Sequence, residues 1–294
     1  MEGKIKNRDG SFLTGCTCGK SLHFLYETTA GRIILNLLTR RFLSKLAGTY
    51  MNSRVSKLNI KNTINSCGID LSEYEVTDHK QFSCYNDFFT RQIKKEKRPV
   101  AQGPETFISP CDSKLTVYTI SEESCFFIKG SAYTVADLVG GNQTLADQYK
   151  GGFCLIFRLS VDNYHRYCYI DNGKKGENNF VPGVLHTVNP IALGRYNIYK
   201  RNCREYTVLH TENFDDVVQI EVGAMMVGRI KNHHGAHSFK KGEEKGMFEF
   251  GGSTIVLLVK KDILTIDSDI VANSAENIET TVKIGERVAV RKQY

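Results

Sequence analysis

The feature that most constrains the fold is a change of pattern at Pro99. Beyond this proline, short runs rich in Val, Ile, Leu, Phe and Tyr follow one another, and Gly, Asn and Asp separate most of them. Runs of this length and spacing are typical of an antiparallel β protein. The predicted strands are Leu115–Ile120, Cys125–Ile128, Phe153–Leu159, Tyr206–His210, Val217–Gly223, Met225–Ile230, Phe248–Phe250, Ile255–Val259 and Val282–Val290. Two short segments among them, residues 135–139 and 146–149, favour helix.

The residues before Pro99 favour helices instead. Residues 1 to about 30 show no clear period, and we expect them to be irregular. From Arg32 onward, apolar residues recur at steps of three and four, which predicts a helix over residues 32–47. Two further helices are predicted over residues 53–66 and 82–91. The predicted fold class is therefore α+β, with a helical N-terminal region, 1–99, and a mostly antiparallel β domain, 100–294.

Composition and charge limit the classes of partner. The chain is 24% charged and 41% hydrophobic, as an ordinary globular protein is. Its net charge of +7 is modest and spread out. Nucleic acid is not expected, because no basic stripe with interleaved aromatic residues is present. An anionic membrane surface and a phosphate-bearing substrate both fit the charge.

The helix predicted over residues 32–47 has two interpretations. It could pack its apolar stripe on the body of the protein, or it could lie in a membrane interface with its cations toward lipid phosphates. Those cations are Arg32, Arg40, Arg41 and Lys45. No stretch approaches the roughly 18 uninterrupted apolar residues that a membrane-spanning helix needs. We therefore expect contact with a membrane surface and no crossing.

The cysteines indicate a reducing compartment. They are odd in number and follow no framework spacing, at positions 16, 18, 67, 84, 111, 125, 154, 168 and 203. The polar start of the chain also lacks the apolar core of a secretion signal, so free thiols in a cytoplasm are expected. No metal site is predicted. Cys16 and Cys18 near His23 lack a second pair at zinc spacing, and Gly235 interrupts His233, His234 and His237, which have no apparent carboxylate or Cys partner.

Three turns of the predicted β domain carry polar residues in apolar surroundings. Asp112 follows a proline, where Asp usually bonds its own backbone but can also orient a catalytic base. His165 and Arg166 follow a predicted buried strand. His165 is either a structural histidine or a proton carrier, and in the second case Arg166 would bind an anion beside it. Ser253 follows a glycine pair between two apolar runs. Spacing alone does not show that these residues meet.

The segment around Ser253 has two interpretations of its own. A glycine pair inside a strand pattern marks a bulge or a close backbone approach, with Ser253 an ordinary hydrogen-bonded serine. Alternatively, the Ser253 hydroxyl attacks the carbonyl of Gly252, because flexible glycines permit the strained backbone that such an attack needs.

From about Phe82 to Val290 the chain resembles the phosphatidylserine decarboxylase proenzymes, a bacterial-type, pyruvoyl-dependent family. No single motif is specific, but their shared order and spacing are, and the Gly-Ser-Thr segment is the most diagnostic. The motifs are Asn86-Asp87-Phe88-Phe89-Thr90-Arg91, Arg98-Pro99, Ser109-Pro110-Cys111-Asp112, Ile128-Lys129-Gly130, Tyr164-His165-Arg166, Val188-Asn189-Pro190, Glu205, Val222-Gly223-Ala224, Val227-Gly228, Lys241-Gly242-Glu243 and Phe248-Glu249-Phe250-Gly251-Gly252-Ser253-Thr254.

This resemblance implies a self-cleaving enzyme with its β domain closed around the cleavage site. Ser253 attacks the Gly252 carbonyl, and elimination from the resulting ester leaves a pyruvoyl group at residue 253. The products are chains 1–252 and 253–294, the smaller with 294 − 252 = 42 residues, and they remain associated. The pyruvoyl group forms a Schiff base with phosphatidylserine and acts as the electron sink that releases CO₂, giving phosphatidylethanolamine.

The resemblance also implies the roles of three residues. Asp112 matches the family's charge-relay aspartate, His165 matches the first histidine of its Tyr-His-Arg motif, and Ser253 is the pyruvoyl precursor. The family usually has a second histidine, the base for self-cleavage, where this chain has Cys168. A thiol is a poorer base unless its pKa is lowered. Three explanations stay open: His165 acts in both steps, His186 substitutes, or processing is impaired.

Two other functions are compatible with the sequence. One is a related pyruvoyl decarboxylase of a soluble amino acid, and the other is an unprocessed, non-catalytic lipid-binding homologue. For the leading interpretation we expect a peripheral protein on the cytoplasmic side of the cell membrane, with a homodimer left open. Side chains that could contact a lipid phosphate are Arg166, Lys240 and Lys241.

Overall fold

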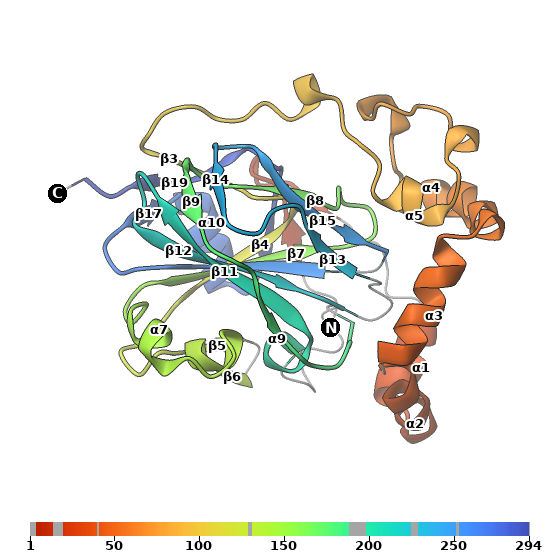
Figure 1. The fold of residues 1–294 in the computed structure, drawn as a ribbon, viewed down its shortest axis with the longest axis horizontal. Helices are drawn as coiled ribbons and strands as arrows, with labels where there is room; N and C mark the ends of the chain where they lie inside the picture. The colour runs from red at the N-terminus through yellow and green to blue at the C-terminus, as the bar shows by residue number, and fades with distance from the viewer. Residues whose placement is uncertain are drawn as a thin grey trace.

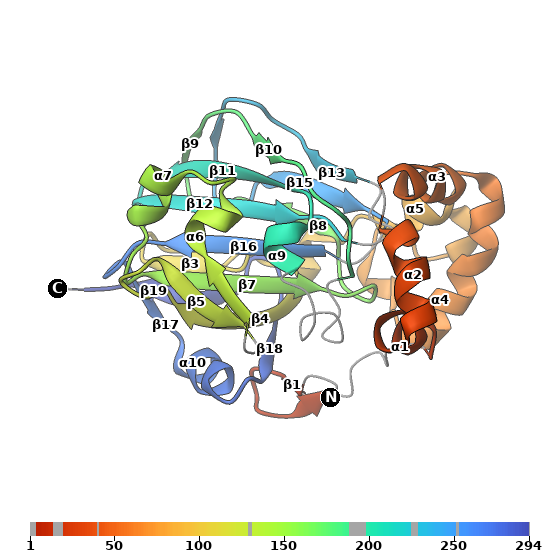
Figure 2. The same ribbon diagram turned by 90° about the horizontal axis from the view of Figure 1, so that it is seen from below.

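The computed structural model describes residues 4–13, 20–39, 41–128, 131–187, 198–224, 229–250 and 253–293. A group of N-terminal helices stands at one end of a large β body (Figures 1 and 2). The strands pair antiparallel throughout the described residues, with one parallel exception between β1 and β18. This arrangement confirms the predicted α+β class, whereas the division into domains at residue 99 stays a prediction.

An 11-stranded sheet forms the centre of the β body. Its order is β14 (His237–Phe239), β9 (Gly173–Lys175), β11 (Arg204–Thr211), β12 (Asp216–Val222), β16 (Ser253–Val259), β7 (Phe153–Leu159), β4 (Ser113–Thr119), β18 (Glu279–Val282), β1 (Ile5–Lys6) and β2 (Phe12–Leu13), with β10 (Asn179–Val181) also on β11. Three smaller sheets complete the body. They are β13 (Arg229–Asn232), β15 (Glu244–Glu249) and β8 (Arg166–Cys168); β17 (Leu264–Ile266), β19 (Arg287–Arg291) and β3 (Thr106–Ile108); and β5 (Cys125–Ile128) with β6 (Ser131–Thr134).

Strand β16 is the innermost strand of the large sheet. Every residue from Ser253 to Val259 is buried. Figure 2 shows the strand between β12 and β7, which pair with it on either side. A strand covered on both faces needs a continuous apolar run, and Ile255–Val259 supplies one. The strand's first residue, Ser253, therefore starts inside the core, opposite Leu159 of β7.

The N-terminal helices have an aromatic core of their own. The segment comprises, in chain order, α1 (Lys20–Glu27), α2 (Thr29–Leu38), α3 (Arg41–Met51), the 3₁₀ helix η1 (Arg54–Asn59), α4 (Ile60–Cys67), the 3₁₀ turns η2 (Leu71–Glu73) and η3 (His79–Gln81), α5 (Tyr85–Phe89) and the 3₁₀ turn η4 (Lys95–Lys97). Gly68 ends α4 in the left-handed conformation, with φ of 63°. The buried cluster includes Phe82, Tyr85, Phe88 and Phe89, and it also takes in Tyr164 and Phe250 of the β body. The helical segment thus packs directly on the chain that leads to Ser253.

Among the residues that the structure describes, four short helices lie within the β body: α6 (Val135–Leu138), α7 (Gln143–Asp147), α9 (Ile198–Arg201) and α10 (Ser268–Ala275). Of these, α6 was predicted, α7 was predicted a few residues too far along the chain, and α9 and α10 were missed. Sheets and helices share one continuous core of buried side chains from both the large and the small sheets.

Three predictions about elements are wrong. The described part of residues 1–30 is not irregular, because it contains β1, β2 and α1, and β1 extends the large sheet beside β18. The single helix over 32–47 is two helices, α2 and α3. The run Val282–Val290 is two strands, β18 and β19, separated by a turn at Gly285 with φ of 81°.

Some predictions concern residues that the structure does not describe. These are Cys16, Cys18, Arg40 and the cleavage-site residue Gly252 with its neighbour Gly251, together with the motif residues 129–130, 188–190 and 227–228. Among the helices that are described, none has the length and apolar character required to span a bilayer.

Candidate active site

Ser253 is a buried hydroxyl group without a hydrogen-bond partner among the described residues. Its side chain is 0% exposed, and its Oγ contacts no donor or acceptor there. A buried polar group left unpaired costs about 1–3 kcal/mol, so such groups are rare and invite an explanation. The hydrogen bond expected of an ordinary serine in a bulge is not seen among the described residues. The role of this hydroxyl stays a prediction.

His165 is a second buried polar side chain with the same property. It lies in the loop between β7 and β8, is 0% exposed, and neither ring nitrogen has a partner among the described residues. The imidazole packs against the Phe89 ring, with ring centroids 3.8 Å apart and the planes tilted by 31°. Its backbone carbonyl accepts a hydrogen bond of 2.9 Å from the amide of Phe248, on the strand that leads to Ser253. The ring is therefore held mainly by packing, and among the described residues the only hydrogen-bonding group that affects its pKa is the nearby Asn163 backbone.

Burial lowers the pKa of His165 to about 3, and the nearby positive charge of Arg91 lowers it further, while the carboxylate of Asp162 opposes the shift. The imidazole is consequently neutral at physiological pH. A neutral imidazole can accept a proton, which a protonated one cannot.

Arg91 is a buried cation beside His165 that the sequence analysis did not single out. Its side chain is 3% exposed and lies over the rings of Tyr74, at 4.3 Å, and Phe88, at 4.9 Å. It donates to the Phe88 carbonyl at 3.2 Å and the Tyr74 hydroxyl at 3.1 Å, but its Nε has no partner among the described residues.

No carboxylate pairs with Arg91 in the part of the chain that the structure describes, in contrast to Arg98, Arg158 and Arg166. Burying a charge without a counter-ion is costly, so a position of this kind suits an incoming anion. The signal in the sequence was its place at the end of the Asn86–Arg91 motif.

Asp112 lies on the turn before β4, and its carboxylate is held by Arg98. Arg98 Nε is 3.1 Å from both carboxylate oxygens, its Nη2 is 2.8 Å from Oδ2, and the Ile284 amide donates to Oδ1 at 2.8 Å. Arg98 also contacts Glu73 at 3.1 Å, and these carboxylates raise its pKa although burial opposes this. Among the described residues no hydrogen bond joins Asp112 to His165.

Cys168 lies at the end of β8, close to the Asp112 turn. Its amide donates to the Pro110 carbonyl at 2.9 Å, and its Sγ is 3.9 Å from the Ser109 carbonyl. Burial raises the pKa of the thiol to about 12, so it is protonated at neutral pH. A protonated thiol can donate a hydrogen bond and cannot serve as a general base.

His186 lies near the start of β16 as well, on the side of its partner strand β12. Asn202 bridges it to β12, because its Nδ2 donates to the His186 carbonyl at 2.8 Å and to the Gly223 carbonyl at 2.7 Å. Gly223 follows Val222, the residue that pairs with Thr254. The His186 ring contacts the Tyr26 hydroxyl at 3.5 Å, and burial lowers its pKa to about 4.

The structure therefore brings the predicted site residues together in part. His165 and Ser253 lie on segments that share contacts with Phe89 and with the end of β15, whereas Asp112 and Cys168 form a neighbouring group around the Ser109–Asp112 turn. Their catalytic roles stay predictions.

Two of the three predicted phosphate contacts are already occupied. Arg166 pairs with Glu244 at 2.9 Å, and Lys241 Nζ donates to the Gly103 carbonyl at 3.0 Å. Lys240 lines a surface pocket of about 540 Å³ with Lys174 and His210.

One prediction about the histidines that follow β13 is wrong, namely that they have no carboxylate partner. Carboxylates do pair with two of them: His237 contacts Glu243 and His233 contacts Glu244, each at 2.7 Å. Glu243 lies in the turn after β14 and Glu244 opens β15, and sequence spacing did not place either of them beside these histidines.

Comparisons with known proteins identify the family. The sequence model of the phosphatidylserine decarboxylase family matches residues 85–290. Phosphatidylserine decarboxylase proenzyme 2 of Clostridium acetobutylicum is 48% identical over 268 residues, which cover 91% of this chain and 90% of that protein. Phosphatidylserine decarboxylase proenzymes of Clostridium botulinum strain 657 and Clostridium tetani are 40% and 37% identical, over 93% and 92% of this chain and 93% and 91% of theirs.

The chain belongs to the phosphatidylserine decarboxylase family. It is a decarboxylase of that family, a carboxy-lyase. The resemblance stated from the motifs is thereby confirmed.

The lowered pKa values of His165 and His186 predict acid sensitivity. In the unfolded chain both imidazoles take up a proton near pH 6.5, whereas in the folded chain they do so only near pH 3 and pH 4. Between these pH values the unfolded state binds more protons than the folded state. The stabilisation that the two neutral imidazoles contribute is therefore fully present above about pH 6.5 and is lost as the pH falls toward 4. Each group contributes a slope of at most about 1.4 kcal/mol per pH unit.

Urea unfolding of the uncleaved Ser253→Ala chain between about pH 7 and pH 5 measures this dependence. Adding His165→Gln should flatten the slope, and adding His210→Gln, at a surface position 61% exposed, should not. Equal slopes with and without His165 would contradict the assignment of a buried neutral imidazole.

Proposed function

We propose that this chain is a self-cleaving decarboxylase of phosphatidylserine whose cofactor is a pyruvoyl group made from Ser253. The observation that carries the proposal is the buried, unpartnered hydroxyl of Ser253 at the first position of the central strand, directly after a glycine pair. The proenzyme names of the relatives fit a precursor that must be processed. The pyruvoyl group, once formed, would supply a carbonyl that accepts the electron pair left behind by departing CO₂.

Self-cleavage needs a nucleophile and a base. The Ser253 oxygen attacks the carbonyl carbon of Gly252, the bond from that carbon to the Ser253 nitrogen breaks, and the nitrogen takes up the proton that the hydroxyl lost. Removal of the Ser253 α-proton then expels the Gly252 carboxylate and leaves a dehydroalanine. Water would hydrolyse its imine tautomer to the pyruvoyl carbonyl, with the Ser253 nitrogen leaving as ammonia. His165 is the proposed base, because it is neutral, has unpaired nitrogens and lies on the loop that follows the partner strand of Ser253.

Cys168 suits a different task from the histidine that it replaces. Its protonated thiol could donate to the oxygen that develops negative charge during the attack, so it is proposed as an assisting donor. Asp112, locked to Arg98 and to the Ile284 amide, is proposed to hold the neighbouring turn in place and to contribute negative charge near Cys168. His186 stays a candidate for assistance at the opposite side.

Arg91 is the proposed anchor for the phosphodiester of the substrate. It is a buried cation with an unused N–H and no carboxylate partner among the described residues. Binding the substrate carboxylate there would stabilise the ground state and slow its loss as CO₂, whereas binding the phosphodiester carries no such penalty. A bound phosphodiester would also offset the charge that lowers the pKa of His165, and so help that imidazole to hold the proton needed at the α-carbon.

Decarboxylation of three substrates tests this proposal: phosphatidylserine, glycerophosphoserine and free serine. The purified protein should act on both phosphodiesters and far less on serine, and Ser253→Ala should abolish activity. Arg91→Met should raise KM for glycerophosphoserine at least about tenfold, because a charge-assisted pair contributes about 1.5–3 kcal/mol. The urea unfolding midpoint of each variant is the control for folding. Equal use of free serine would favour a soluble amino acid decarboxylase, and an intact, inactive chain would favour a binding protein.

The two chains should stay together after cleavage. Strand β16, which the small chain would begin with, is hydrogen-bonded along its length to β7 and β12 of the large chain. It also lies in the shared core. Breaking one peptide bond before the strand leaves these contacts in place.

We also propose that the N-terminal helices rest on an anionic membrane, at the cytoplasmic face of the cell membrane. Large apolar side chains are exposed on them, which is unusual for a surface that meets only water. They are Phe24, Ile33, Ile34, Leu46, Tyr50, Val55 and Leu58, with exposed fractions from 45% to 82%. The exposed cations Arg54 and Lys61 on η1 and α4 suit lipid phosphates. A homodimer stays a prediction.

Cosedimentation with phosphatidylserine-containing vesicles measures this contact. The double variant Ile33→Asp and Leu58→Asp should lower binding strongly. These apolar side chains are 71% and 82% exposed, and each aspartate would place a negative charge against the anionic membrane. Phe127→Asp is a matched control, since Phe127 is 63% exposed on β5, within the β body. Equal loss in both variants, or loss in neither, would contradict the proposed surface.

A further inference from the structure

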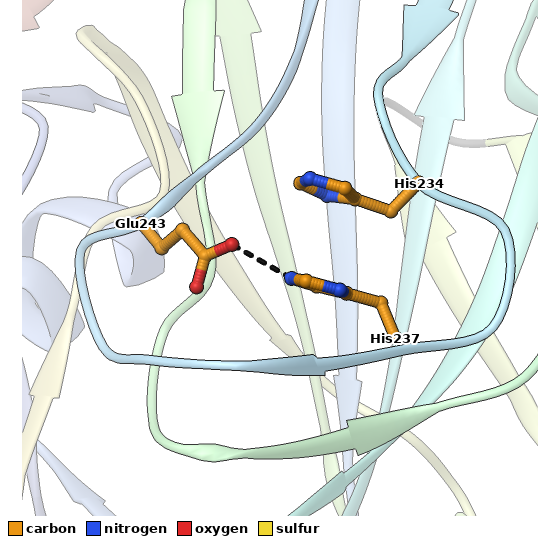
Figure 3. A group of neighbouring side chains, drawn as sticks. All are labelled: His234, His237 and Glu243. Atoms are coloured by element: carbon orange, nitrogen blue, oxygen red, sulfur yellow. Dashed lines mark hydrogen bonds and ion pairs between the residues drawn. The ribbon is translucent and has the colours of Figure 1, made fainter.

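Two histidines and a glutamate come together outside the candidate active site. His234 lies in the loop between β13 and β14, His237 opens β14, and Glu243 lies in the turn before β15, as Figure 3 shows. One ligand atom from each residue lies within 4.8 Å of the other two. The imidazole rings are stacked, with centroids 3.9 Å apart and an interplanar angle of 10°. The segment connects β13 of a small sheet with β14 of the large sheet.

The donor groups are oriented by further hydrogen bonds. His234 Nδ1 contacts the Tyr169 hydroxyl at 3.2 Å, which leaves its Nε2 on the side of the cluster. Glu243 Oε2 accepts the Lys240 amide at 2.9 Å, and its Oε1 faces His237 Nε2 at 2.7 Å. Partners that fix the remote atom of a histidine or carboxylate are typical of metal ligands.

The loop that carries His234 is also held in place. Lys175 Nζ donates to the carbonyls of His234, at 3.1 Å, and Gly235, at 2.6 Å. Asn178 donates to the same His234 carbonyl at 3.0 Å. A loop ordered by the folded protein loses little further freedom when a ligand binds.

We propose that His234, His237 and Glu243 bind a divalent transition-metal ion of the zinc type, with water as a fourth ligand. Two imidazoles and one carboxylate are a ligand set that Zn²⁺ favours. Ligand bonds of about 2.0–2.2 Å require the three donor atoms to move closer to one another, which side-chain rotation allows because all three residues are only partly buried. The ion replaces the proton that His237 and Glu243 share, and that proton is released to solvent.

The site would link the two sheets. Glu243 directly precedes β15, which pairs with β8 and β13, while His237 belongs to β14 at the edge of the large sheet. An ion bound between them fastens the connection without touching Ser253. The inference is thus independent of the proposed reaction.

His233 provides a control from the same loop. Its Nε2 contacts Glu244, at 2.7 Å, and Glu244 is already paired with Arg166 at 2.9 Å. It is not part of the three-residue group. A second control is His210, an exposed histidine that contacts Asp216 at 2.6 Å and belongs to no three-ligand group within the described residues.

Metal titration of the full-length protein, prepared without a histidine tag, tests the proposal. Zn²⁺ binding is measured by calorimetry, and the visible absorption of Co²⁺ reports a four-coordinate site with nitrogen and oxygen ligands. We expect one Zn²⁺ per chain, at least tenfold weaker binding in His234→Gln and in His237→Gln, and unchanged binding in His233→Gln and His210→Gln. Excess Zn²⁺ should raise the Tm of the parent and of both controls, but not that of the His234→Gln/His237→Gln double variant.

Two results would overturn the assignment. One is parent protein that binds Zn²⁺ no more tightly than the double variant, which would mean that no site exists there. The other is loss of binding in His233→Gln or His210→Gln equal to that in His237→Gln, which would place the ion elsewhere or show only general affinity for histidine.

Discussion

The pairing of β16 with β7 and β12 is the interaction on which the rest of the structure depends. It fixes the register that places Ser253 opposite Leu159, and it buries the strand from its first residue. The proposed reaction needs this arrangement twice. Before cleavage, the paired strand holds the hydroxyl still beside the glycine segment, and after cleavage the same hydrogen bonds keep the new chain end in the core.

The N-terminal helices complete the site because they provide one wall of it. Phe89 of α5 contacts both His165 and Phe250, with ring centroids 3.8 Å and 5.6 Å apart, and Asn86 accepts the Phe250 amide at 3.0 Å. This packing removes water from His165 and lowers its pKa, and it also buries Arg91. The same helices carry the exposed apolar side chains that are proposed to contact the membrane. One segment would thus join the proposed membrane surface to the proposed chemistry.

Much of the β domain could be predicted from sequence because its strands are local apolar runs. Phe153–Leu159 and Cys125–Ile128 were placed at their observed bounds. Strand β1 was missed since two residues carry no periodic signal and depend on distant β18. In the site, motifs singled out Ser253 and His165, but neither the pairing of Asp112 with Arg98 nor the lack of a carboxylate partner for Arg91 among the described residues. Outside the site, the approach of Glu243 to His237 was not predicted either. Those depend on side chains brought together by the fold.

Intact mass spectrometry of the purified protein tests the central claim, that Ser253 is consumed to make the cofactor. The account predicts that the 33.2 kDa chain is replaced by two chains, the smaller with 42 residues, 253–294. That smaller chain should be lighter by one ammonia than a peptide beginning with serine, while Ser253→Ala should give one uncleaved species. A parent protein that stays whole at 33.2 kDa, or a small chain with a free serine amine, would contradict it.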